Sequence, residues 1–209
     1  AFSFYTQKNI STLGEGGMVT AADDEVFRRI ELYQNHGVSY ARNLTDEPES
    51  LAKPWYRDCI QTGYNYRMGE AQAAVGITQL RKLDRFNETR TALAAAYSEM
   101  LEGIDGVTLP AQRHNVKSSW HFYVIKVEKD FGLERDDVVA RLGRLGVEAN
   151  VHYTPLHYFK PYRELGYGKG DFPIAEEQYE KVISLPLNAT TSHEQVEYVA
   201  ECLRKVGNG

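Results

Sequence analysis

Cysteine, long apolar runs and clusters of basic residues are all scarce in this sequence of 209 residues. The two cysteines, Cys59 and Cys202, lie far apart, which excludes a disulfide framework and the closely spaced cysteine pairs of zinc sites. No apolar run approaches the ~18 residues that a membrane-spanning helix needs. Basic and acidic residues are interspersed and the formal net charge is −5, which argues against nucleic acid as a partner.

The residues that are present have the composition of a globular protein, with 42% hydrophobic and 25% charged side chains. Two cysteines and no charged-then-apolar leader lead us to expect a cytoplasmic protein. The 14 tyrosines suit a pocket for a polar, planar or sugar-like ligand, although tyrosines also occupy half-buried surfaces. Because Ala1 falls inside a predicted strand, we expect the chain to be the C-terminal half of a longer protein.

Before residue 102 the sequence predicts strands and loops around two helices. In chain order they are short strands at 1–4 and 17–22, a helix from Asp23 or Asp24 to about His36, and a long surface loop at 38–62. Apolar residues then recur at near-helical spacing from Ala71 to Leu101, which predicts one unusually long helix. Because long helices often bridge domains, we expect a first domain at 1–90 and a second at 91–209.

The rest of the chain predicts a layer of strands and helices. In chain order they are a turn and short strand at 103–110, a strand at 120–127, a helix at 136–145, a strand at 147–153, a helix opened by Pro173, a strand at 184–187 and a last helix to about Val206. Ser192 and Gln195 have the spacing of a capping box at the start of that last helix. This order of strands and helices favours an α/β fold class.

Lys8 lies at the mouth of a turn that the glycines within 14–17 make flexible. An amine held at a strand end, with the Ser3 hydroxyl five residues before it, is well placed to form a Schiff base with a carbonyl cofactor. The alternative is an ordinary solvated lysine in a loop. A glycine-rich turn alone does not decide between the two.

Asn65, Tyr66 and Arg67 stand directly before the predicted long helix. An amide, a guanidinium and the free N–H groups of a helix start together make a site for an anion such as a phosphate. The alternative is structural: Asn65 caps the helix and Arg67 pairs with an acidic neighbour.

Two further stretches carry histidine. His121 follows Trp120 at the start of the strongest predicted strand, where a structural role is the simpler interpretation. His152 and His157 flank a turn, but no nearby cysteine or carboxylate completes a zinc ligand set. Hydrogen bonds to a polar substrate are therefore the better functional interpretation, and a purely structural turn is the alternative.

Taken together, these stretches resemble the DegT/StrS family of sugar aminotransferases, which are pyridoxal-phosphate enzymes of fold type I. The motifs follow the family's order: Ser3-Phe4-Tyr5 with Lys8-Asn9-Ile10, Gly14–Met18, Gly63–Met68, Gln72-Ala73-Ala74, Gln79-Leu80, Ser119-Trp120-His121, Val151–His157, Asp171-Phe172-Pro173 and Ser184–Leu187. Each motif alone is weak, whereas the ordered set spans the chain and is specific. The resemblance implies the end of a large cofactor-binding domain at 1–90 and a small α/β domain at 91–209.

The resemblance also implies roles for single residues. Lys8 would bind the cofactor covalently and later move a proton, and Ser3 would bind the cofactor phosphate in the same subunit. Asn65 and Arg67 would reach the phosphate of the neighbouring subunit's cofactor, which implies a homodimer with shared active sites. The substrate side would carry the remaining candidates, Tyr5, His152, Tyr153 and His157.

The implied reaction moves an amino group from glutamate or glutamine to a keto group of a nucleotide-linked deoxysugar, with no metal. Related dehydratases carry histidine in place of the lysine, so Lys8 argues for transamination. Tyr5 stands where many relatives have histidine, Leu13 lengthens the glycine turn, and the family's ring-holding residues would precede Ala1. The alternatives are a cyclitol aminotransferase, a dehydratase or an aromatic amino-acid synthase of the same fold, or a truncated relative that only binds or regulates.

Overall fold

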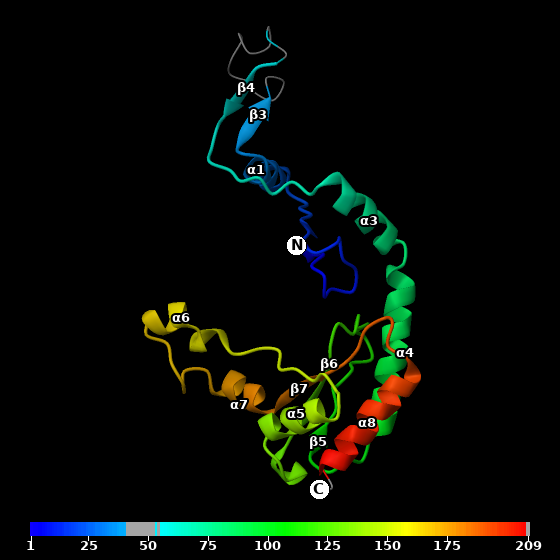
Figure 1. Cartoon of the computed structure of the whole chain (residues 1–209). Helices are drawn as coiled ribbons and strands as arrows, with labels where there is room; N and C mark the ends of the chain where they lie inside the picture. The colour runs from blue at the N-terminus through cyan, green and yellow to red at the C-terminus, as the bar shows by residue number, and fades with distance from the viewer. Residues whose placement is uncertain (41–52, 54, 208–209) are drawn as a thin grey trace. The chain divides into compact units, whose positions relative to one another are not determined.

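The computed structural model describes residues 1–40, 53 and 55–207, which form parts of two compact units, Ala1–Leu83 and Asp84–Gly209 (Figure 1). Each unit combines helices with short strands, so the predicted mixture of the two is confirmed. The domains predicted at 1–90 and 91–209 stay a prediction. No helix in the described ranges is both long and apolar enough to cross a bilayer.

The first unit is built around two antiparallel strand pairs and two helices. Its elements are β1 (Phe2–Ser3) paired with β2 (Gly17–Met18), α1 (Asp24–Gln34), β3 (Val38–Tyr40) paired with β4 (Arg57–Cys59), and α3 (Glu70–Leu80). The Asp23 side chain caps α1 by accepting from the Val26 amide at 2.8 Å, as the sequence predicts. The prediction of a loop at 38–62 is wrong where β3 and β4 pair. The sequence did not reveal these strands because three residues are too few to show an alternating pattern. Residues 41–52 and 54 of the predicted loop lie outside the described ranges.

The single long helix predicted from Ala71 to Leu101 is also wrong. The structure has two helices, α3 and α4 (Leu83–Leu101), separated by a turn at Arg81 and Lys82. In that turn the Lys82 amide bonds to the Gln79 carbonyl at 2.9 Å, three residues back instead of four. Neither proline nor glycine marks the break, and the apolar spacing continues across it, so the pattern could not reveal it.

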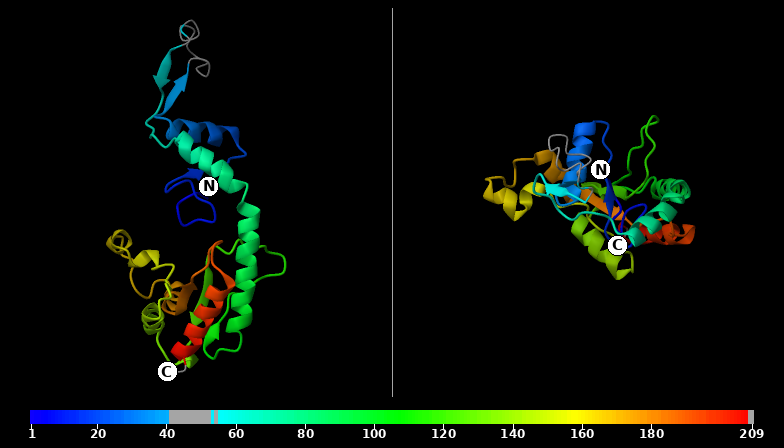
Figure 2. Two further views of the ribbon diagram at one scale, coloured as in Figure 1. Left: turned by 45° about the vertical axis from the view of Figure 1, so that its right-hand side comes forward. Right: turned by 90° about the horizontal axis from the view of Figure 1, so that it is seen from above.

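The second unit is a three-stranded antiparallel sheet, in the order β5-β6-β7, with helices packed against it (Figure 2). Its elements are α4, β5 (Val107–Thr108), β6 (Tyr123–Val127), η2 (Lys129–Phe131), α5 (Arg135–Arg144), η3 (Leu156–Tyr158), α6 (Lys160–Glu164), α7 (Pro173–Lys181), β7 (Val182–Leu185) and α8 (His193–Gly207). The core lies where α4 and α8 meet one face of the sheet, around Tyr97, Ile125 and Leu203. Ser192 and Gln195 form the predicted capping box at the start of α8.

The strand predicted at 147–153 is wrong. Asn150 forms one isolated bridge with Ser184 of β7, and no strand is assigned to that segment in the described chain. The segment leaves the sheet edge after this bridge because the His152 ring turns onto Phe122, where the two rings stack with centroids 4.0 Å apart. The strand at 120–127 is confirmed in its main part, beginning at Tyr123.

Candidate functional site

The lysine turn, residues 4–16, is a hydrogen-bonded reversal that extends the β1–β2 pair. The Phe4 amide donates to the Gly16 carbonyl and the Thr6 amide to the Gly14 carbonyl, each at 2.8 Å. The Lys8 amide then closes a tighter turn on the Tyr5 carbonyl at 2.9 Å. These bonds fix the backbone under Lys8, whose side chain is half-buried rather than fully solvated.

Thr12 fills the inside of this turn, a position that the sequence did not single out. Its side chain is only 1% exposed, and its hydroxyl donates to the Glu15 carbonyl at 3.0 Å. A Cβ at Gly16 would lie 2.0 Å from the Thr12 Oγ1, and a Cβ at Gly76 of α3 would lie 2.9 Å from its Cγ2. The turn therefore packs directly on α3, and the two glycines are the sequence signal for this close approach.

Ser3 and Tyr5 lie at the open end of the turn. Both are exposed, and the Ser3 hydroxyl accepts a long hydrogen bond of 3.4 Å from the Tyr5 amide. Both side chains can therefore be reached from outside the turn.

Asn65 and Arg67 lie before α3, and neither takes the structural role considered as their alternative. Gly69 is the N-cap of α3, so Asn65 does not cap that helix; it forms an isolated bridge with Asn35 instead. Arg67 donates from Nη1 to the Asn35 Oδ1, and no ion pair of Arg67 with an acid is found within the described ranges.

Arg67 and the glycine turn line one groove of the first unit. The groove has a volume of about 750 Å³, and its walls include Phe2, Gly16, Gly17, Arg67, Met68 and Gln72. A Cβ at Gly16 would lie 3.3 Å from the Met68 Cε, which confirms how close the two stretches come. The structure thus places Arg67 beside the glycine end of the lysine turn.

His152 and Tyr153 lie on the face of the sheet that is turned away from the core. In the β6–β7 register Tyr123 faces Leu185 in the core, whereas Val124 and Ser184 point to the opposite face. The His152 Nδ1 lies 2.8 Å from the Ser184 Oγ. Tyr153 is 65% exposed and meets the Phe122 and His152 rings edge-on. Phe122 and Ser184 support this face and were not predicted.

His157 is buried, unlike Tyr153, and its Nε2 lies 2.9 Å from the Glu176 Oε1. Burial alone would raise the pKa of the Glu176 carboxyl, but hydrogen bonds from the Gly170 and Phe172 amides and from His157 outweigh it and lower this pKa. The structure therefore ties His157 to α7, so a direct bond from His157 to a substrate stays a prediction that this geometry does not favour.

Trp120 and His121 have the structural surroundings that the sequence favoured. Trp120 belongs to the core, and the buried Arg90 donates to the carbonyls of Trp120 and Leu187 at 3.0 Å and of His121 at 3.3 Å. Burial lowers the pKa of Arg90. Arg90, which was not predicted, thus ties α4 to the residues just before β6 and just after β7, which lie at the same end of the sheet. In the described ranges no three His, Cys, Asp or Glu residues are grouped as a metal site requires.

Comparisons with known proteins agree on one family. The family model of the DegT/DnrJ/EryC1/StrS aminotransferases matches residues 1–204. The spore coat polysaccharide biosynthesis protein SpsC of Bacillus subtilis is 34% identical over 212 aligned residues, covering 100% of this chain and 54% of SpsC.

Solved structures show the same relationship. PseC of Helicobacter pylori, an aminotransferase in pseudoaminic acid biosynthesis, matches with a TM-score of 0.85 and 28% identity over 99% of this chain and 52% of PseC. Spr1654 of Streptococcus pneumoniae in its PLP-form matches with a TM-score of 0.82 and 25% identity over 99% of this chain and 51% of Spr1654. The predicted fold, a part of the aminotransferase fold, is confirmed, and the chain spans about half the length of the relatives it matches. By the ordered motifs, the fold and the family match over nearly its whole length, this chain belongs to the DegT/DnrJ/EryC1/StrS aminotransferase family.

Proposed function

We propose that the protein containing this chain is a pyridoxal-phosphate-dependent aminotransferase. It would move an amino group from glutamate or glutamine to the keto group of a nucleotide-linked deoxysugar. The observation that carries the proposal is the lysine turn, which holds a half-buried amine on a fixed backbone in a chain of an aminotransferase family. The relatives named for polysaccharide and pseudoaminic acid biosynthesis support a sugar as the substrate.

The residues around the turn fit pyridoxal phosphate. Lys8 offers a primary amine for its aldehyde, and Ser3 offers a hydroxyl for its phosphate in the same subunit. Arg67 offers donors for the phosphate of the neighbouring subunit's cofactor. A Cβ at Gly17 would lie 2.9 Å from the Phe2 carbonyl oxygen, so only glycine lets the chain pass this close beside the groove. When bound, pyridoxal phosphate supplies the electron sink that transamination needs.

This chain's own residues position the reactants and move the proton. Lys8 would hold the cofactor at its aldehyde, with loss of water, and its free amine would carry a proton to and from the reacting carbon of the substrate. His152 and Tyr153 donate or accept hydrogen bonds on the substrate side, and Tyr5 lines the entrance near Lys8. His157 acts on that side through the segment it anchors.

The same proposal includes a cytoplasmic homodimer with shared active sites. Asn65 and Arg67 would bind the phosphate of the cofactor held by the neighbouring subunit, while Ser3 would bind the phosphate in its own subunit. Mixing an inactive Lys8 variant with an inactive Arg67 variant tests this arrangement, because shared sites predict that mixed dimers regain part of the activity. Two inactive populations that stay inactive after mixing would argue against sharing.

The covalent role of Lys8 is tested directly by labelling. The full-length protein is loaded with pyridoxal phosphate, its visible absorbance is recorded, the adduct is reduced with borohydride and the labelled peptide is mapped. We expect a single label on Lys8. A label on another lysine, or none, would overturn the proposal.

The reaction class is tested separately. Glutamate-dependent formation of pyridoxamine phosphate distinguishes transamination from dehydration. A screen of keto-sugars against keto-cyclitols and keto-acids then distinguishes the sugar aminotransferase from the cyclitol aminotransferase and the aromatic amino-acid synthase. We expect turnover with nucleotide-linked keto-sugars.

A further inference from the structure

Residues 150–157, called here the substrate-side segment, run alongside α7 and β7 in the opposite direction. Asn150 and Ser184 exchange backbone hydrogen bonds of 3.1 and 2.7 Å. Further along, the Thr154 Oγ1 lies 3.4 Å from the Tyr179 hydroxyl oxygen, and the His157 Nε2 lies 2.9 Å from the Glu176 Oε1. Because residue numbers rise on one side as they fall on the other, these contacts form an antiparallel series that ends at Glu176.

Glu176 is the most heavily bonded member of this series. Its Oε1 and Oε2 accept from the Gly170 amide at 2.8 and 2.9 Å, and its Oε1 also accepts from the Phe172 amide at 3.2 Å. Glu176 is only 9% exposed, whereas Gly170 and Phe172 are exposed, so these bonds hold an exposed turn onto a buried carboxylate. One carboxylate thus joins three parts of the chain: η3, the 168–172 turn and the first turn of α7.

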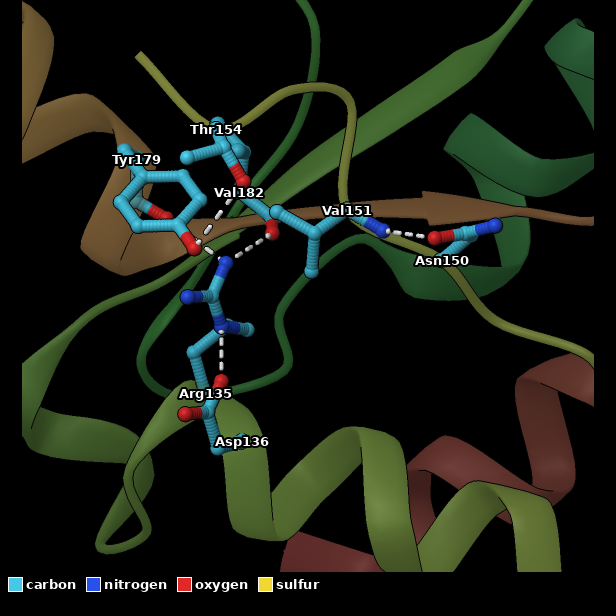
Figure 3. Close-up of polar contacts among 7 residues, drawn as sticks. All are labelled: Arg135, Asp136, Asn150, Val151, Thr154, Tyr179 and Val182. Carbon is cyan, nitrogen blue, oxygen red and sulfur yellow. Dashed lines mark hydrogen bonds and ion pairs between the residues drawn. The ribbon is translucent and has the colours of Figure 1, made fainter. Parts of the chain in front are cut away.

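The helix that carries Glu176 is itself held in place (Figure 3). The Arg135 Nη1 donates to the Tyr179 carbonyl at 2.7 Å and to the Val182 carbonyl at 3.3 Å, where α7 ends and β7 begins. The Arg135 guanidinium also lies 4.9 Å from the centre of the Tyr179 ring. Figure 3 shows both Arg135 and Thr154 next to Tyr179, so this residue links Arg135 to the substrate-side segment.

We propose that Glu176 is a positioning residue, which fixes His157 and the 168–172 turn and thereby holds His152 and Tyr153 over the open face of the sheet. The inference rests on the proposed function, because it assigns Glu176 to the substrate side of that reaction. An ionised carboxylate suits this position because both of its oxygens accept and neither donates. A glutamine keeps one acceptor oxygen but places an NH₂ group where Oε2 accepts, so it loses one of the two bonds from the Gly170 amide.

The test compares Glu176→Ala and Glu176→Gln in the full-length enzyme with Glu177→Gln as the matched control. Glu177 is the next residue of α7, and its carboxylate forms an exposed ion pair with Lys181 at 2.8 Å. Hydrogen exchange is measured at the Gly170 and Phe172 amides, and kcat and KM for the keto-sugar are measured per folded active site. If Glu176 holds His152 and Tyr153 in place, we expect kcat/KM to fall roughly 10- to 100-fold in Glu176→Ala, mainly through a higher KM. The fall should be smaller in Glu176→Gln.

Glu176→Ala should lose exchange protection at both amides and Glu176→Gln should lose part of it at Gly170, while Glu177→Gln should keep protection and kinetics. A merely structural role would lower the folded fraction and leave the KM of the folded enzyme unchanged, which would overturn the proposal. Unchanged protection in Glu176→Ala would overturn it too. If that variant does not fold, Glu176→Gln decides by the same criteria.

A wild-type protein that transfers no amino group would contradict the proposed function instead. In that case the exchange measurement alone decides whether Glu176 holds the segment.

Discussion

The two units hold their candidate residues in different ways. The lysine turn of the first unit is fixed by backbone hydrogen bonds and by contact with glycines, over a small core in which Ile10 is the one buried hydrophobic side chain among those described. The substrate-side segment of the second unit is fixed by side chains, on a sheet whose other face covers a large core. The comparison teaches that the position of Lys8 depends on backbone geometry, whereas the position of residues 150–157 depends on a few polar side chains.

Both units leave apolar side chains exposed. Examples are Phe2, Phe27, Ile77 and Leu80 in the first unit and Leu156, Leu165 and Ile174 in the second. Exposed apolar side chains that gather in a patch are typical of surfaces that meet another protein surface. In the proposed dimer, Asn65 and Arg67 of the first unit would face the neighbouring subunit.

Replacing Lys8 should have the largest effect. Lys8→Ala removes the amine on a backbone that the remaining hydrogen bonds still hold, so we expect kcat to fall by at least roughly 10²–10⁴-fold, the contribution typical of a general acid–base group. Folding, followed by circular dichroism and urea unfolding, should stay close to that of wild type. Lys82→Ala, at an exposed site of the same unit, should keep full activity. Substantial turnover by Lys8→Ala would contradict the proposed catalytic role of Lys8.

A pair of leucine substitutions compares the core of the second unit with an exposed helix of the first. Leu203 of α8 is 0% exposed and Leu80 of α3 is 57% exposed. Leu203→Ala should lower the free energy of unfolding by about 2–5 kcal/mol, because it leaves a cavity in the core. Leu80→Ala should change it by less than about 0.5 kcal/mol. Urea unfolding measures both. A cost of several kcal/mol for Leu80→Ala would mean that a partner surface covers this face in the assembled protein.

A pair of glycine substitutions tests the backbone dependence of the lysine turn. Gly16→Ala places a Cβ 2.0 Å from the Thr12 Oγ1, so we expect a loss of about 1–3 kcal/mol in stability and weaker cofactor binding. Gly143→Ala, in α5, meets no atom within 4 Å and should stabilise by about 0.4–1 kcal/mol. Thermal unfolding and a titration with pyridoxal phosphate follow the two effects. Equal behaviour of the two variants would contradict tight packing inside the turn.

The smallest expected effect is a pH dependence in the second unit. The pKa of Glu176 is lower in the folded chain than in the unfolded one, so its stabilisation is complete above the unfolded value and is lost as the pH falls through the folded value. The groups that face it are His157 and Tyr158, and burial together with Glu176 raises the pKa of Tyr158. The stability difference between wild type and Glu176→Gln should therefore be largest near pH 7 and shrink toward pH 3, in urea unfolding at each pH. A difference that grows toward low pH would reverse the assignment.

Local signals predicted local structure well. The Asp23 cap and the Ser192–Gln195 box were predicted because each needs only residues within one helical turn. The run of aromatic and β-branched residues within Trp120–Val127 was strong enough to locate β6. The break at Arg81 leaves the apolar spacing unchanged, so periodicity does not report it. At 147–153 the contact of His152 with Phe122 joins residues 30 positions apart, which periodicity does not report either.

The candidate site could be predicted only in part for the same reason. The resemblance located Lys8, Asn65, Arg67, His152 and Tyr153 as candidates, whereas Glu176 and Thr12 came from the structure alone. In the sequence, Glu176 cannot be distinguished from an exposed acidic residue in the first turn of a helix. Its partner His157 lies 19 residues before it, so no local pattern pairs the two. Thr12 looks like an ordinary turn residue until Gly16 and Gly76 are seen to close on it.

Thr12, Gly16 and Gly76 pack into one small space, so the residue allowed at each position depends on the other two. No side chain can be added at either glycine while threonine fills that space. A smaller residue at position 12 should make an alanine at position 16 or 76 tolerable, so substitutions at these positions should be non-additive. The three residues are therefore expected to change together or not at all, although 64 positions separate the first from the last.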